Sequence, residues 1–277
     1  MKVEIQPISG KAQYSLNLLR WALLTVLFLV FITVPVTWGD SGTATVIELT
    51  DSDRATLDTL LGPGVVGKAV PASVIENPQD FLPFRVCDWN FRVASGKAKG
   101  KMRPHSLRPL KRDEPVGAWR LSPGSHHIVY LRRSKDGSIS VISEQDADQG
   151  MIVRFSPHVP ILLPGFKPGE TRDFKIDVKV YDVTHPDHLK HEGHIKLKIS
   201  YLGAFEVSVP AGKQEAILIK WEDKGKVGPA VVEDIHYRFF VKDSGLVAQI
   251  DKKNISAFLI YNEHLKEGEV LIDVCVQ

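Results

Sequence analysis

Four histidines spaced three residues apart form the cluster with the most evident chemical potential in this chain of 277 residues. They are His185, His188, His191 and His194, and the acidic residues Asp182, Asp187 and Glu192 lie among them. Imidazole and carboxylate groups bind zinc and other transition metals. A spacing of three sends successive side chains to opposite faces of a strand, so all four converge only in a special loop. The cluster predicts a solvated polar loop, with weak metal binding by two or three histidines as the alternative.

Two short motifs match functional signatures in the wrong context. Gly39-Asp40-Ser41-Gly42 matches the sequence around the nucleophile of chymotrypsin-like proteases. In those proteases the catalytic His and Asp precede the serine, whereas here only a hydrophobic segment precedes it. Gly62-Pro63-Gly64-Val65-Val66-Gly67 has the form G-x-G-x-x-G, but it follows an expected helix rather than a strand. Neither motif predicts an activity, and the sequence implies no cofactor.

A basic strip without acidic residues is the other candidate for binding. It contains Arg92, Lys97, Lys99, Lys101, Arg103, Arg108, Lys111 and Arg112. Outside a membrane, Lys97, Lys99, Lys101 and Arg103 could contact anionic lipid head groups or an acidic envelope polymer. Nucleic acid is disfavoured because the strip lacks interleaved stacking aromatic residues. A solvated linker is the alternative interpretation.

An uncharged run of 18 residues, Trp21 to Trp38, indicates where these residues act. It is typical of a cleaved export signal or of an uncleaved membrane anchor, and its length does not decide between them. The flanking charges are asymmetric: Lys2, Lys11 and Arg20 precede the run, whereas Asp40, Glu48 and Asp51 follow it. This asymmetry predicts a cytoplasmic N-terminus and a remainder of the chain on the outer side of the membrane.

The two cysteines, Cys87 and Cys275, both fall in the part that is expected to be exported. An oxidising compartment permits a disulfide between them, and two separate buried thiols are the alternative. Such a bridge would join the beginning of the exported domain to its end.

Hydrophobic residues alternate with polar ones through most of the second half of the chain, which is typical of strands with one buried face. The pattern is seen in 174–180, 195–201, 205–209 and 235–241, and turn residues such as Pro210-Ala211-Gly212 lie between the runs. No long amphipathic helix interrupts them, so a parallel βαβ architecture is disfavoured. We expect a mainly β, antiparallel fold that forms a curved sheet, a sandwich or an open barrel.

The sequence divides into three expected parts. Residues 1–39 hold the cytoplasmic tip and the signal or anchor helix, residues 40–118 a small helix and a Pro/Gly-rich basic linker, and residues 119–277 the antiparallel β domain. The small helix is predicted from Leu57, Leu60 and Leu61 on one face, with Asp51 or Ser52 as its cap and Gly62 at its end.

The region from about Pro164 to Ile250 resembles uncharacterised exported β-sheet domains of bacterial cell envelopes. The matching residues are Val207, Val209, Pro210-Ala211-Gly212, Ile217, Ile219, Tyr237, Phe239 and Gly245-Leu246-Val247. The resemblance implies a half-barrel-like sheet, related in shape to periplasmic lipid carriers. It transfers no catalytic residue.

The sequence as a whole favours a non-enzymatic envelope protein that acts as a binding or structural module. The formal net charge of +2 gives no general attraction for nucleic acid. One alternative is a carrier of lipids or other hydrophobic ligands, and another is a metal-dependent enzyme that uses the loop from His185 to His194. Membrane contact through the N-terminal segment is expected, and no protein partner is indicated.

Overall fold

The computed structural model describes residues 44–110, 118–257 and 261–273, which belong to a compact unit from Gly42 to Gln277. The run from Trp21 to Trp38 lies outside the described residues, so the signal and the anchor both remain predictions. Neither helix in the described part of the chain is long and apolar enough to cross a membrane.

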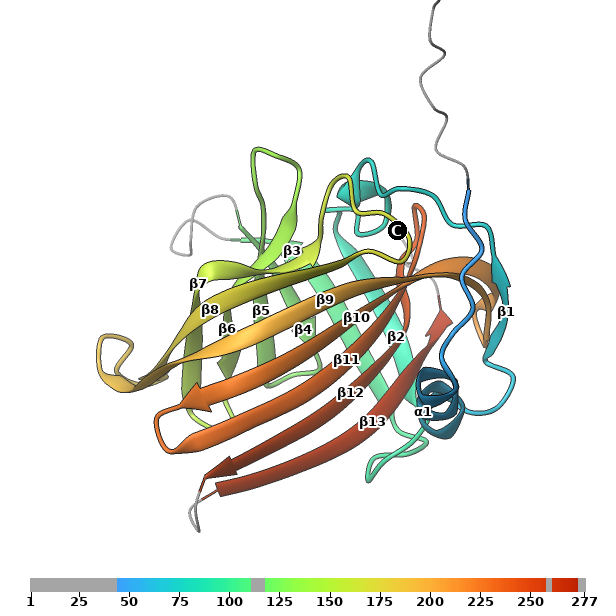
Figure 1. Cartoon of the computed structure of the whole chain (residues 1–277). Helices are drawn as coiled ribbons and strands as arrows, with labels where there is room; N and C mark the ends of the chain where they lie inside the picture. The colour runs from blue at the N-terminus through green and yellow to red at the C-terminus, as the bar shows by residue number, and fades with distance from the viewer. Residues whose placement is uncertain (1–43, 111–117, 258–260, 274–277) are drawn as a thin grey trace, which may run out of the picture. The chain divides into compact units, whose positions relative to one another are not determined.

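The described chain is mainly β-strand, as predicted (Figure 1). In chain order the elements are α1 (Asp51–Leu61), β1 (Val66–Val70), η1 (Pro78–Asp80), β2 (Cys87–Val93), β3 (Met102–Pro109), β4 (Ala118–Pro123), β5 (His127–Arg133), β6 (Ile139–Asp146), β7 (Met151–Leu162), β8 (Thr171–Asp182), β9 (Leu189–Val209), β10 (Gly212–Val227), β11 (Ala230–Val241), β12 (Gly245–Ala257) and β13 (Tyr261–Asp273).

The described strands form one antiparallel sheet of 13 strands, of which the 12 from β2 to β13 close into a barrel and β1 extends the sheet beside β9. Its order is β1-β9-β10-β11-β12-β13-β2-β3-β4-β5-β6-β7-β8, and β8 also pairs with β9. The 21-residue strand β9 makes this closure possible because it pairs with β8 up to Ser200 and with β1 from Ala204 onward. The antiparallel β prediction is confirmed, and the open or half-barrel shape that was expected is closed here by the β8–β9 ladder.

The expected boundary at residue 118 does not divide the structure. Strands β2 and β3 fall in the predicted linker, yet they pair with β13 and β4 in the same sheet. In β2, Cys87, Trp89, Phe91 and Val93 are buried and alternate with exposed residues. This short alternation is masked in the sequence by the prolines, glycines and basic residues on either side.

The helix α1 lies where the sequence predicts it, with a different cap. The Thr50 side chain, rather than Asp51 or Ser52, accepts a hydrogen bond of 3.1 Å from the backbone N–H of Asp53. The helix ends at Gly62, whose φ of 109° favours glycine.

Trp221 shows which face of the sheet points into the barrel. Its indole N–H donates a 2.9 Å hydrogen bond to the carbonyl of Pro160 in β7, a strand that is not a neighbour of β10. Directly paired residues share a face of the sheet. Trp221 pairs with Ile199 and His236, and His236 pairs with Asp251. These side chains therefore point inward, and the residues that alternate with them point outward.

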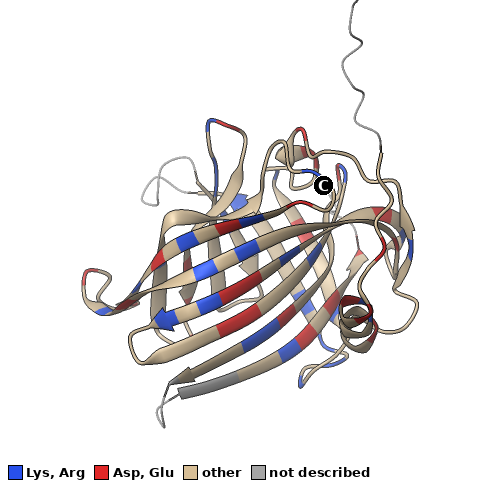
Figure 2. Cartoon of the chain, viewed as in Figure 1, with Lys and Arg blue, Asp and Glu red and all other residues tan. Residues whose placement is uncertain are grey.

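The outward face of β8 and β9 is polar, as the alternation predicts. Lys175, Asp177 and Lys179 are exposed, whereas Ile176 and Val178 between them are buried. Figure 2 shows Lys and Arg side by side with Asp and Glu along these strands. The outer surface therefore carries mixed charge, which is typical of a solvated face.

The helix α1 packs on part of the outward face of the sheet, against β12 and β13 (Figure 1). The Tyr237 hydroxyl donates a 2.7 Å hydrogen bond to Asp53, and the Lys220 ammonium lies 3.0 Å from the same carboxylate. At Gly268 the helix approaches the strand so closely that an added Cβ would lie 2.2 Å from the backbone oxygen of Leu60. The missing side chain of Gly268 is therefore what allows this approach.

Residues 71–86 cover one end of the barrel. The Tyr201 hydroxyl of β9 donates a 3.1 Å hydrogen bond to the carbonyl of Ser73, and Arg133 of β5 donates a 2.5 Å hydrogen bond to Gln79. Because β5 and β9 belong to different sides of the ring, a segment bound to both crosses that end. The turns of the β6–β7, β8–β9 and β10–β11 hairpins lie at the opposite end (Figure 1).

Gly268→Ala is expected to lower the free energy of unfolding by about 1–3 kcal/mol, because the new methyl group must displace the backbone of α1. Urea denaturation measures the change. Gly67→Ala is the control, since its nearest neighbour would be a side-chain carbon at 3.2 Å. Equal losses in the two variants would contradict the close packing of α1 at Gly268.

Candidate binding site in the barrel interior

One side of the barrel interior is apolar. We call it the apolar wall, and its members on β7, β8 and β9 are Val153, Phe155, Phe174, Ile176, Val178, Val180, Ile195 and Leu197. The register places Phe155 opposite Val178 and Phe174 opposite Leu197. Ile176 is fully buried, whereas Phe155 and Phe174 are only half-buried. Part of this apolar surface therefore remains uncovered by the protein.

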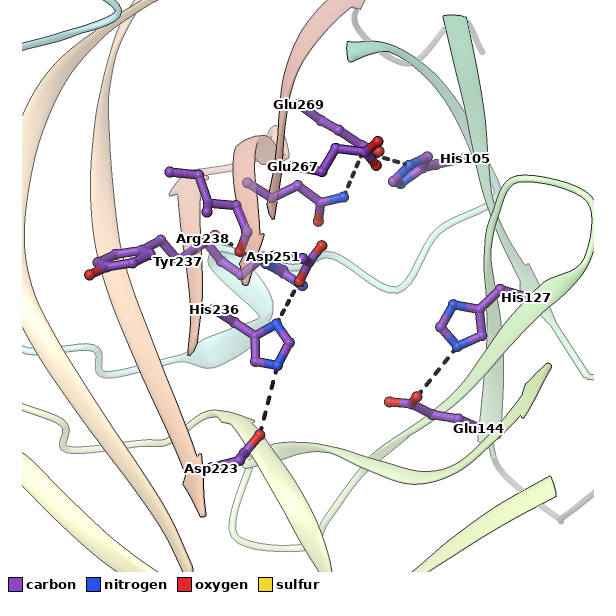
Figure 3. A network of polar contacts seen from close by, with 12 residues as sticks. His105, His127, Glu144, Asp223, His236, Tyr237, Arg238, Asp251, Glu267 and Glu269 are labelled. Atoms are coloured by element: carbon purple, nitrogen blue, oxygen red, sulfur yellow. Dashed lines mark hydrogen bonds and ion pairs between the residues drawn. The ribbon is translucent and has the colours of Figure 1, made fainter. Parts of the chain in front are cut away.

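The other side of the interior is charged. We call it the charged wall, and its members are Arg103, His105, His127, Glu144, Asp223, His236, Arg238, Asp251, Glu267 and Glu269. Figure 3 shows His236 and Asp251 on one side, and His127 and Glu144 facing them from another part of the sheet. Charged side chains inside a protein require partners, and most of these groups have them.

His236 is held between two carboxylates. Its Nδ1 lies 2.5 Å from Asp251, and its Nε2 lies 3.8 Å from Asp223. Arg238 donates a 2.6 Å hydrogen bond to Asp251 and a 2.8 Å hydrogen bond to the carbonyl of Ile250. Burial by itself would raise the pKa of Asp251, but the charge of Arg238 and the hydrogen bond from His236 hold that pKa well below its ordinary value.

A second group surrounds Glu269. Arg103 contacts Glu269 and lies 2.5 Å from Glu267, and Gln249 donates a 2.6 Å hydrogen bond to Glu269. His105 Nε2 lies 3.2 Å from the same carboxylate, and both of these side chains are almost completely buried. Burial would raise the pKa of Glu269, but His105, Arg103 and Gln249 together lower it. This carboxylate is therefore ionised and fully engaged.

The pair His127 and Glu144 lies nearer to water. The two side chains are 3.3 Å apart, with 31% and 35% of their surfaces exposed. The pKa of Glu144 is lowered because His127, Lys253 and His236 outweigh the effect of burial. Since His236 and Lys253 belong to β11 and β12, charges on the other side of the interior affect Glu144 on β6. The exposed fractions of His127 and Glu144 show that solvent reaches inward-facing side chains of the charged wall.

Asp223 lies where the two walls meet. It pairs directly with Leu197 of the apolar wall on one side and with Asp234 on the other. Burial raises the pKa of Asp223 to about 6; the charge of His236 opposes this shift, and Asp234 and Glu144 add to it. Its Oδ1 atom is buried and has no hydrogen-bond partner in the described structure. Asp223 is thus the least satisfied acid of the charged wall.

The four predicted metal ligands are not brought together. His185 and His188 lie in the turn between β8 and β9, and His191 and His194 lie on opposite faces of β9. All four are exposed. Among the described residues there is no group of three or more His, Cys, Asp or Glu side chains that could hold a metal ion.

The basic strip separates into two parts. Lys97, Lys99 and Lys101 are exposed at the β2–β3 hairpin, where they could still contact an anionic surface. Arg103 instead points into the barrel and binds Glu267 and Glu269. Residues two positions apart in a strand share a face, so Arg103 and His105 of β3 both point inward. Lys97, Lys99 and Lys101 precede the strand and belong to the turn.

Sequence reasoning missed the charged wall because it took the polar face of β11 to be solvent-facing. Ile235 and Tyr237 were expected on a buried face, and Tyr237 is buried, but this face points out of the barrel toward α1. His236 and Arg238 alternate with them and point into the barrel. The sequence did contain a signal for this arrangement. The predicted short helix has an apolar face, and that face must pack against an apolar surface outside the sheet.

The Cys87–Cys275 bridge remains a prediction. Cys87 begins β2 and is buried, and no described cysteine is free. Cys275 lies outside the described residues, shortly after the end of β13, which pairs with β2. The unreduced full-length chain should be lighter than the reduced chain by two hydrogen atoms in intact-mass spectrometry, and Cys275→Ser should abolish this difference. Equal masses before and after reduction would exclude the bridge.

Asp223→Asn is expected to raise the free energy of unfolding by up to about 3 kcal/mol at about pH 8, since each unit of pKa shift is worth roughly 1.4 kcal/mol. The folded state keeps the proton of Asp223 at pH values where the unfolded state has lost it. The wild type therefore loses this stability as the pH rises from 3.8 to about 6, and the variant does not. Urea denaturation across this range measures the difference.

Asp251→Asn serves as the opposite control. It should lower stability near neutral pH, because Arg238 and His236 lose their charged partner. If Asp223→Asn were no more stable than the wild type at any pH, the ionised Asp223 carboxylate would not destabilise the folded state.

Comparisons with known proteins do not assign this chain to a family. No family model and no curated protein matches it. Three solved structures are similar, each with a TM-score of 0.37. They are a predicted exported protein with a YmcC-like fold from Bacteroides fragilis (13% identity, 73% of this chain and 99% of that chain), a predicted lipoprotein from Parabacteroides distasonis (12%, 74% and 100%) and the hypothetical lipoprotein YmcC from Escherichia coli (7%, 82% and 96%). At this level of likeness they assign neither a family nor a role to this protein.

Proposed function

We propose that this protein is a binding protein that holds a small amphipathic molecule inside its barrel. The observation that carries the proposal is the division of the interior into an apolar wall and a charged wall that meet between β9 and β10. The register shows the change directly, since Phe174 pairs with Leu197, and Leu197 pairs with Asp223. A molecule with an apolar tail and a polar end can satisfy both walls at once.

The partial exposure of inward-facing side chains supports this role. Phe155 and Phe174 are half-buried on the apolar wall, and about a third of the Glu144 and His127 side chains is exposed on the charged wall. A ligand would displace water from the uncovered apolar surface, which is the main source of affinity for an apolar tail. The segment 71–86 covers one end, so we place the entry at the end of the hairpin turns.

The arrangement of the imidazoles favours binding over catalysis. His236 has a carboxylate next to each of its ring nitrogens, and His105 is almost completely buried against Glu269. A general acid or base must reach the proton that it transfers. His236 is held by its two carboxylates, and burial separates His105 from a substrate although its Nε2 makes no hydrogen bond in the described structure. For the location, the charge asymmetry around the run from Trp21 to Trp38 supports a barrel on the outer side of the cytoplasmic membrane.

Phe174→Glu should weaken amphiphile binding by roughly tenfold or more, because it places a charge on the apolar wall and removes apolar contact area. The full chain is purified in an amphipathic polymer, and binding of dodecylammonium, dodecanoate and dodecanol is measured by titration calorimetry and native mass spectrometry. The polymer alone provides the background.

Lys175→Glu is the matched control, since it introduces the same side chain at the adjacent, outward-facing and exposed position. It should leave every affinity unchanged. The proposal fails if none of the three probes binds the wild type in a one-to-one complex, or if both substitutions weaken binding equally.

A further inference from the structure

The charged wall contains more carboxylates than guanidinium groups. It contains five carboxylates, Glu144, Asp223, Asp251, Glu267 and Glu269, and two guanidinium groups, Arg103 and Arg238. Its three remaining members are imidazoles. Asp234 and Lys253, which lie beside the wall, add one charge of each sign. The wall and these two neighbours therefore hold six carboxylates and three guanidinium or ammonium groups, with three imidazoles to supply the remaining positive charge, and a bound cation would add to it.

The most weakly paired carboxylate of the charged wall is Asp223. Glu267 and Glu269 share Arg103, and Asp251 binds both Arg238 and His236. Asp223 has only the longer 3.8 Å contact with His236, and Asp234 lies directly across the neighbouring strand. Its buried Oδ1 atom accepts no hydrogen bond in the described structure. A buried acceptor without a donor is costly, so a ligand that supplies an N–H group there gains affinity.

The position of Asp223 connects the charge to the tail. Its partner across the strand pair is Leu197, which is followed on β8 by Phe174. A cationic group at Asp223 would therefore leave an attached alkyl chain against the apolar wall. An anionic group in the same place would face Asp223, Asp234 and Glu144 together, which like-charge repulsion disfavours.

Resting on the proposed function, we infer that the ligand is an amphipathic amine whose ammonium group donates a hydrogen bond to Asp223. An ammonium group can donate this hydrogen bond, whereas a quaternary ammonium group has the positive charge but no N–H donor. The carboxylate of a fatty acid has neither the positive charge nor a donor.

Four probes with the same dodecyl chain test the inference on the full chain in amphipathic polymer near pH 8. They are dodecylammonium, dodecyltrimethylammonium, dodecanol and dodecanoate. We expect dodecylammonium to bind roughly tenfold or more tightly than dodecanol, because it adds a charged hydrogen bond at Asp223. The quaternary ammonium should fall between them, and dodecanoate should bind most weakly.

Asp223→Asn should reduce the affinity for dodecylammonium to about that of dodecanol while leaving the affinity for dodecanol unchanged. Because this substitution is expected to stabilise the fold, a loss of amine binding would not come from unfolding. Asp173→Asn is the control, since Asp173 is exposed on the same outward face of β8 as Lys175. It should change none of the four affinities.

The outcomes separate the two proposals. Equal affinities for the four probes, or tightest binding of dodecanoate, would overturn the amine and keep the amphiphile-binding function. Preference for the amine that persists in Asp223→Asn would overturn the role of Asp223. If no probe binds, the proposed function itself fails.

Discussion

The pairing of β8 with β9 is the constraint on which the rest of the structure depends. Without this ladder the sheet would have two open edges and two solvent-facing sides. Closure turns one of its faces into an interior, and every second side chain of each strand then belongs to that interior. The long strand β9 permits it by changing partner between Ser200 and Ala204. The apolar wall, the charged wall and the covered end all follow from this ring.

The charged wall also shows how a protein can keep acids inside a barrel. Burial would raise the pKa values of Glu269 and Asp251, but His105 and Arg103 lower that of Glu269, and Arg238 and His236 lower that of Asp251. Asp223 lacks a comparable partner. A residue that costs stability and is not compensated within the fold is best understood through what it can bind.

The sequence was most reliable where alternation and environment agreed. In β8, Ile176 and Val178 point to the interior, and Lys175, Asp177 and Lys179 point to water, as the period of two predicts. In β11 the same alternation was present, but its apolar face packs outward, with Tyr237 bound to Asp53 of α1. Periodicity identifies two faces of a strand and carries no information about which one the rest of the chain will cover.

By itself, therefore, the sequence determined the alternating strands in the second half of the chain, the turns between them, the antiparallel class and the short helix, because these depend on neighbours along the chain. Closure of the barrel, inclusion of β2 and β3 and the meeting of the two walls were decided only by the tertiary structure. Glu144 is far in the sequence from Asp223 and His236, and only the ring of strands brings its charge into the same interior as theirs. Interactions between distant residues depend on which strands pair, and pairing is a property of the whole sheet.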